Sequence, residues 1–244
     1  MGVSISNLSG NYLVEKVVQI VLDDRKSVVA NVNIHAMNLA YQLPWFRDFL
    51  NNSVIVFCDG FGVMLGARLM GSKIHHRFTP PDWIPLLCQA CVQHEFSIYL
   101  LGSYPGVARK AADRLRESNP SLRIVGTHHG YFDKTPGSSG NQAVVDKVNA
   151  VKPNILFVGF GMPIQEKWIM ENLQNVDVNV VVPVGAALEY LSGKKPRAPR
   201  WMTDHGLEWI GRLIVEPSRL WKRYIIGNPL FFLRIVKYRI LPNR

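Results

Sequence analysis

Short apolar runs alternate with longer amphipathic segments along most of the chain. Runs of four to eight apolar residues bounded by turn residues predict buried strands, whereas apolar positions repeating every three to four residues predict helices. The expected strands are 27–34, 53–60, 96–102, 122–132, 154–161 and 178–185. Five of them are each followed by an expected helix, at 35–43, 61–71, 105–118, 163–173 and 186–193.

This alternation of strand and helix predicts repeated βα units, which form parallel sheets. The expected strands are apolar at nearly every position, instead of alternating apolar and polar residues. Strands of that kind are buried on both faces, because helices cover the sheet from both sides. The pattern therefore predicts an α/β fold with a mostly parallel sheet and helices on both faces.

Length and composition fit one large domain, or one domain with an appendage. The chain has 244 residues, of which 48% are hydrophobic, so it can bury a full core. Its three cysteines cannot form a paired disulfide framework. The first residues, MGVSISNLSG, lack the basic, apolar and small-residue order of a signal peptide, which leads us to expect a cytoplasmic protein.

The net charge of +10 is concentrated at the C-terminal end. From Lys194 onward there are 12 basic and three acidic residues, whereas the preceding 193 residues carry 16 bases and 15 acids. The segment GKKPRAPRW, 193–201, marks this change, so we predict a catalytic domain at 1–194 and a basic appendage at 195–244.

Residues 206–240 of the appendage mix aromatic and aliphatic side chains with arginines. No uncharged apolar run approaches the roughly 20 residues of a spanning helix, so this part is expected at most to lie on an anionic bilayer. Arg212, Arg219, Lys222 and Arg223 would share one side of a helix, unless Pro217 interrupts it. An RNA adaptor remains an alternative but ranks lower, because no nucleic-acid module is recognisable.

Polar residues and glycines stand where several expected strands end. Ligands of open parallel sheets bind beyond the carboxyl ends of the strands, and Asn33, Asp59, Gly102, Gly159 and Gly161 all fall there. For Asp59 two roles stay open. It is either the N-cap of the helix at 61–70 or, with the polar residues Asn31 and Asn33, part of a concave polar site.

The glycine-containing turns after the third and fifth expected strands permit close approach of a phosphate to the backbone. Neither turn completes the G-x-G-x-x-G pattern of dinucleotide sites, so a single nucleotide diphosphate is the more economical ligand. An NAD(P)-linked oxidoreductase is the alternative.

No metal site is predicted. Cys88-x-x-Cys91 lies in a segment that reads as a helix and has no second pair, whereas a closed zinc site needs four ligands. An Asp-x-Asp pair, which commonly holds a divalent cation on a nucleotide sugar, is also missing from the sequence.

From about residue 27 to 235 the chain resembles the WecG/TagA/CpsF family of bacterial glycosyltransferases, glycosyltransferase family 26. The resemblance rests on long motifs in the same order: NVNIHAMNLA, CDGFGVMLGARLMG, IYLLGSYPGVARKAADRL, RIVGTHHGYF, ILFVGFGMPIQEKWI, GAALEYLSGKKPRAPRWM and GLEWIGRLIVEPSRLWKRY. It implies a Rossmann-like fold.

The resemblance also implies a reaction: inverting, metal-independent transfer of a hexose from a UDP-sugar to a sugar on polyprenyl diphosphate, at the cytoplasmic face of the membrane. By motif, Asp59 resembles the general base, Asn33 a residue near the sugar, and Arg77 a cation placed for the diphosphate. Gln165 matches the polar residue of the PIQEKW turn. Glycines and Ser103 of the strand ends complete the expected substrate site, and the basic appendage is expected to bind the lipid diphosphate or the membrane.

Two positions depart from the family pattern. Asn31 stands where the family usually has threonine, and TPPDW, Thr79 to Trp83, replaces a frequent Gly-Thr-Asp. Both lie where a donor or acceptor sugar is expected. The sequence therefore leaves the donor open between N-acetylmannosamine, glucose, galactose and a uronic acid, and it leaves the oligomeric state open as well.

Overall fold

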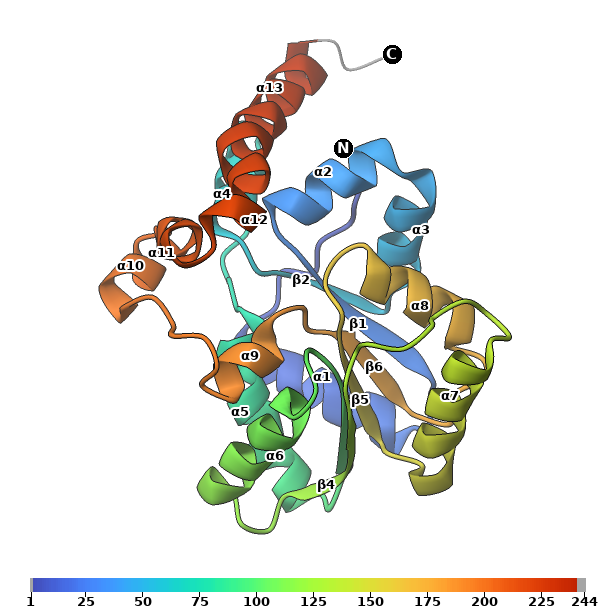
Figure 1. Ribbon diagram of the computed structural model, residues 1–244. Coiled ribbons are helices and arrows are strands. Elements are labelled where there is room, and N and C mark those ends of the chain that lie inside the picture. The colour runs from blue at the N-terminus through green and yellow to red at the C-terminus, as the bar shows by residue number, and fades with distance from the viewer. Residues whose placement is uncertain (1, 241–244) are drawn as a thin grey trace.

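The computed structural model of the protein describes residues 2–240, so the predicted end of the appendage, 241–244, lies outside the described residues. A six-stranded parallel sheet forms the centre, in the order β2-β1-β6-β5-β3-β4 (Figure 1). Its strands are β1 (Ser27–Val32), β2 (Ile55–Cys58), β3 (Ser97–Gly102), β4 (Arg123–His128), β5 (Ile155–Gly159) and β6 (Val180–Pro183). All six strands expected from the apolar runs are thereby confirmed.

Helices cover both faces of the sheet, as predicted (Figure 1). One layer contains α1 (Gly10–Leu22), α5 (Pro80–Gln93), α6 (Val107–Ser118) and α9 (Ala187–Leu191). The other contains α2 (Ile34–Gln42), α3 (Pro44–Asn52), α7 (Ser139–Val151) and α8 (Ile164–Asn172). Successive strand residues serve the two cores in turn: Ile98 packs into the first core and Tyr99 into the second. This double burial explains why the strands are apolar at nearly every position.

The basic C-terminal segment folds as a series of helices that crosses the carboxyl ends of the strands (Figure 1). Its elements are α10 (Arg200–Asp204), α11 (Glu208–Val215), α12 (Pro217–Trp221), the π-helical turn η1 (Lys222–Ile226) and α13 (Gly227–Ile240). No helix within residues 2–240 combines the length and apolarity needed to cross a bilayer. We call residues 195–240 the appendage; its boundary at 194 stays a prediction.

The last helix is fixed to the core by polar and apolar contacts. The Asn38 side chain donates from Nδ2 to the Gly227 carbonyl at 2.8 Å, and the Arg234 guanidinium donates to Asn38 Oδ1 at 2.8 Å. On the other side, α13 packs onto α4 (Phe61–Leu69) so closely that a Cβ on Gly66 would lie 2.7 Å from the Phe231 ring. These contacts hold the appendage over the strand ends.

Candidate active site

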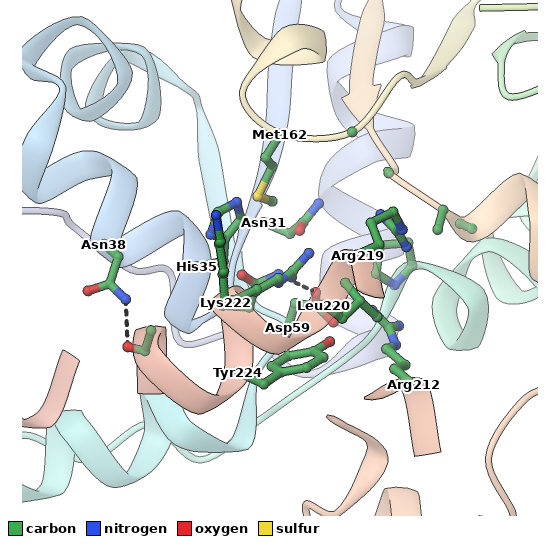
Figure 2. Close-up of a pocket in the computed structure, with 18 of the residues that line it drawn as sticks. Asn31, His35, Asn38, Asp59, Met162, Arg212, Arg219, Leu220, Lys222 and Tyr224 are labelled. Carbon is green, nitrogen blue, oxygen red and sulfur yellow. Dashed lines mark hydrogen bonds between the residues drawn. The ribbon is translucent and has the colours of Figure 1, made fainter. Parts of the chain in front are cut away.

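Asp59 follows directly after β2 and faces a cavity of about 460 Å³ at the carboxyl ends of β1, β2 and β6, which we call the Asp59 cavity (Figure 2). Its backbone N–H donates to the Val32 carbonyl at 2.8 Å, so the residue is held in register with β1. The alternative role as a helix cap is wrong: Gly60 occupies the N-cap of α4, and no side chain caps that helix. The carboxylate is therefore free for chemistry in the cavity.

Asn33 orients this carboxylate. Its Oδ1 accepts from the Ala36 N–H at 3.1 Å and so caps α2, while its Nδ2 donates to Asp59 Oδ2 at 3.1 Å. Because one end of the amide is committed to the cap, the other end must present a donor to Asp59. Asn31 is buried beside them and donates to the Pro183 carbonyl at 2.7 Å, which joins the ends of β1 and β6. Both asparagines line the Asp59 cavity, as expected for residues near a substrate.

The four basic residues predicted in the appendage, Arg212, Arg219, Lys222 and Arg223, all line the Asp59 cavity. The expectation that they share one helix face is wrong. The chain leaves α11 after Val215, restarts with Pro217 in the first turn of α12, and passes into the π-helical turn. This broken path brings all four cations to the Asp59 cavity, and Figure 2 labels three of them among the residues that line it.

Two of these cations, Arg212 and Arg223, are half-buried and influence the pKa of Asp59. Arg212 donates to Glu208 Oε1 at 2.7 and 3.1 Å. Burial opposes its charge, but the Glu208 and Asp59 carboxylates and two neighbouring tyrosines together outweigh burial and raise the pKa of the guanidinium. Among residues 2–240 Arg223 forms no ion pair with a carboxylate, and burial lowers its pKa although Asp59 acts in the other direction. Its Nε is buried and finds no hydrogen-bond partner among residues 2–240. A buried N–H group without a hydrogen-bond acceptor lowers the stability of the protein, so this side of the cavity is suited to an anionic ligand.

The charge of Asp59 is set by opposing influences. Burial of the carboxylate raises its pKa above the ordinary aspartate value, and the Glu208 carboxylate adds to this. The Arg212 and Arg223 cations and the Asn33 hydrogen bond act in the other direction. A carboxylate of raised pKa beside cations is a stronger proton acceptor than an exposed aspartate, which suits a general base.

His35 lies in the same cavity and was missed by the sequence reasoning. Burial and the nearby Arg223 cation lower its pKa to about 4, so the imidazole is neutral near pH 7. The sequence feature that could have identified His35 is its position two residues after Asn33, in the first turn of α2. A neutral imidazole can accept a proton, which makes His35 the competing candidate for a base.

Arg77 lies at a smaller side cavity of about 90 Å³ that also includes Asp59, Arg212 and Arg223. Its guanidinium donates to the Thr203 carbonyl at 3.1 Å and lies 4.0 Å from Glu208. The structure thus places this predicted diphosphate-binding cation between the core and the appendage, where it also holds α10 and α11 in place.

A second cavity of about 610 Å³, the Tyr104 cavity, lies beyond the ends of β3, β4 and β5. Ser103, Gly159 and Gly161 line it, whereas Gly102 lies beneath. The Tyr104 and Tyr131 rings stack at its edge with centroids 4.9 Å apart, and Lys194 Nζ lies 3.6 Å from the Tyr104 centroid. This cavity adjoins the Asp59 cavity through shared lining residues: Gly161, Gly185, Ala186 and Arg219.

Polar residues around the Tyr104 cavity tie the appendage to the core. Ser103 Oγ donates to Glu189 at 3.2 Å, and Lys195 forms ion pairs with both Glu189 and Glu216. Glu216 in turn pairs with Arg219 at 2.6 Å. Ser103 and Arg219 are therefore linked through a chain of charges, which positions Arg219 where the two cavities meet.

Gln165 is placed below the cavities instead of at their surface. Its side chain is fully buried, at 0% exposure, and its Oε1 accepts from the N–H groups of Gly161 and Gly185 at 3.2 and 3.0 Å. Its Nε2 donates to Glu166 at 2.8 Å. This predicted substrate-binding residue has its hydrogen bonds satisfied within the protein, so it acts by positioning the two glycine loops that separate the cavities.

Gly102 is required by the close approach of β3 and β5. It has φ +149°, and a Cβ there would lie 2.4 Å from the Gly159 carbonyl oxygen. Gly102→Ala is expected to lower the free energy of unfolding by well over the ~1 kcal/mol typical of backbone strain at positive φ, because a rigid carbonyl must also move. Gly106→Ala is the matched control, since Gly106 has φ +81° but open space around it. Equal losses in urea unfolding would contradict the clash.

Within residues 2–240, no group of three or more His, Cys, Asp or Glu side chains is placed to hold a metal ion. Cys88 and Cys91 are buried in α5, and burial raises the pKa of the Cys88 thiol to about 12. These thiols are therefore core residues. Metal independence of the reaction stays a prediction.

Sequence comparison relates the chain to a family of glycosyltransferases. The sequence model described as "Glycosyl transferase WecG/TagA/CpsF family" matches residues 1–244. A relative from Staphylococcus aureus strain NCTC 8325 / PS 47 is named N-acetylglucosaminyldiphosphoundecaprenol N-acetyl-beta-D-mannosaminyltransferase. It is 29% identical over 214 residues, which cover 86% of this chain and 79% of the relative. The proteins of that name from strains COL and MW2 show the same identity and coverage.

Proposed function

Because the chain belongs to the WecG/TagA/CpsF family of glycosyltransferases, we propose that it transfers a hexose from a UDP-sugar to a sugar carried on polyprenyl diphosphate. The reaction inverts the anomeric carbon, needs no bound metal, and serves cell-surface polysaccharide synthesis at the inner face of the plasma membrane. The observation that carries this proposal is the Asp59 carboxylate, oriented by Asn33 in a cavity lined by four cations.

In the proposed reaction Asp59 acts as the general base. It removes the proton from a hydroxyl of the acceptor sugar while that oxygen attacks the anomeric carbon of the donor. The bond from this carbon to the UDP oxygen breaks, and UDP leaves with the electron pair. Burial supports this role, because it raises the pKa of Asp59 and so makes the carboxylate a better proton acceptor.

The departing and lipid-linked diphosphates need positive charge, which the appendage supplies. Arg219 borders both cavities, so we assign it to the UDP diphosphate at the Gly161 and Gly185 loops. Arg212 and Arg223 line the side of the Asp59 cavity away from those loops and suit the acceptor diphosphate. Cations held in place before reaction stabilise developing charge without reorganising, which replaces the usual metal.

We place the nucleotide in the Tyr104 cavity. The stacked Tyr104 and Tyr131 rings offer an aromatic edge for a base, and Lys195 and Arg219 provide cations on the way to the Asp59 cavity. The arrangement also supports the choice of a mononucleotide: the glycine turns lack the dinucleotide pattern, and the shared border directs a diphosphate toward Asp59.

The proposal is tested by UDP release from a panel of UDP-sugars in the presence of EDTA. We expect release only when a polyprenyl-diphosphate-linked sugar is also present, with one donor preferred. UDP release that requires added divalent metal would overturn metal independence. Substrate-dependent oxidation of NAD(P)H with no use of any UDP-sugar would instead support the oxidoreductase alternative.

A further inference from the structure

The proposed acceptor is amphiphilic: a sugar and a diphosphate joined to a long apolar chain. The charged head is accounted for by the Asp59 cavity, but the chain needs an apolar path away from it. We propose that the first part of the polyprenyl chain lies in a groove along the outer side of α4. This inference rests on the proposed function and adds a lipid-binding site to it.

The groove has a volume of about 560 Å³ and runs between α4 and the segment 71–74. Phe61, Met64, Leu65 and Ile74 provide its apolar surface. Phe61 and Leu65 are one helical turn apart and remain 47% and 44% exposed. An exposed apolar track of this kind indicates a binding surface.

The groove is continuous with the reaction site through Phe61. The side cavity, which contains Asp59, Arg212 and Arg223, is also lined by Phe61. Gly206 of the appendage packs against this ring, since a Cβ on Gly206 would lie 2.7 Å from it. Phe61 therefore stands where the cationic side cavity ends and the apolar groove begins, the order in which an acceptor presents its diphosphate and its chain.

Charge supports the same occupant. Arg68 and Lys73 line the groove, and none of the acidic residues within 2–240 does so. Cations beside an apolar track suit a lipid next to an anionic bilayer. The other cavities are less suitable paths. The Tyr104 cavity is assigned to the nucleotide, and the Asp59 cavity is bordered by the polar Asn38 and Gln42 as well as by apolar residues. An apolar cavity of about 340 Å³ at Val63 and Phe231 shares no lining residue with the Asp59 cavity or the side cavity.

The test compares two acceptors that carry the same sugar diphosphate, one on a polyprenyl chain in detergent micelles and one on a short, water-soluble alkyl chain. Leu65→Asp is expected to reduce the preference for the long chain, as the ratio of the two kcat/KM values, by at least about tenfold, because it places a charge in an apolar groove. Leu65→Gln is the second variant and should act in the same direction. The matched control is Leu86→Asp, on α5 and 40% exposed, which should keep the wild-type ratio.

An unchanged ratio for both Leu65 variants would overturn the groove. The groove is overturned in the same way if both acceptors lose activity equally. It is also overturned if the variants lose vesicle binding alone, or change self-association in sedimentation alone, while the ratio stays the same. A wild-type protein that uses neither acceptor would overturn the proposed function and this inference with it, so the two failures are distinguishable.

Discussion

Replacing Asp59 with asparagine is expected to lower kcat by about 10²- to 10⁴-fold, the contribution typical of a positioned general base. Asparagine keeps the size of the side chain and can still bond to Asn33, but it cannot take up a proton. UDP release measured under saturating donor and acceptor gives kcat, and the dissociation constant of UDP should stay near the wild-type value.

This substitution should not weaken the fold. The folded-state pKa of Asp59 is raised above its unfolded value, so the ionised carboxylate is disfavoured by folding and its contribution to stability decreases as the pH rises through that range. Asparagine removes this cost at pH 7. The free energy of unfolding in urea should therefore equal or exceed that of the wild type.

His35→Asn provides the comparison within the same cavity. Its imidazole is neutral near pH 7 and is the other group able to take a proton. If Asp59 is the base, His35→Asn should reduce kcat much less than Asp59→Asn. The reverse order, with Asp59→Asn close to wild type, would transfer the role to His35.

The sheet was predictable because the apolar sequence of its strands matches the burial that a covered sheet gives them. Every strand except the edge strand β4 is buried on both faces, so an uninterrupted apolar run such as 155–159 has no other stable place than a covered parallel sheet. Helices α1, α3 and α7 were not assigned from the pattern. Helix α3 contains apolar residues such as Phe46 and Phe49, but it follows α2 directly instead of a strand, so its segment lacked the strand-then-helix order on which the assignment depended.

The site was predictable where a residue directly follows a strand, and less so elsewhere. Asp59 and Asn33 occupy strand ends, whose position is fixed by the sheet itself. The approach of Arg212 and Arg223 depends instead on a break after Val215 and on a π-helical turn, which helical periodicity does not encode. For Gln165 the sequence predicted substrate contact, because a polar residue stands in a motif. The structure instead buries its side chain fully, where it holds two loops through hydrogen bonds.

Because the cations that act on Asp59 come from the appendage, the appendage should control the pH dependence of the reaction. Arg212 is the strongest of the groups that lower the pKa of Asp59, acting against the larger effect of burial. Arg212→Met removes this charge and leaves Glu208, which raises the same pKa, without its hydrogen-bonded partner and with the Arg77 guanidinium 4.0 Å away. The pKa of Asp59 should therefore rise further.

The base works only when ionised, so activity is lost as the pH falls through its pKa. The acidic limb of kcat/KM, which reports the free enzyme, should move to higher pH in Arg212→Met, whereas a role for Arg212 in binding alone would lower kcat/KM equally at every pH. Arg219→Met is the control, because Arg219 pairs with Glu216 at the cavity border, and its acidic limb should stay in place. An acidic limb that Arg212→Met leaves unmoved would show that this limb does not report Asp59, and the appendage would then serve binding without tuning the base.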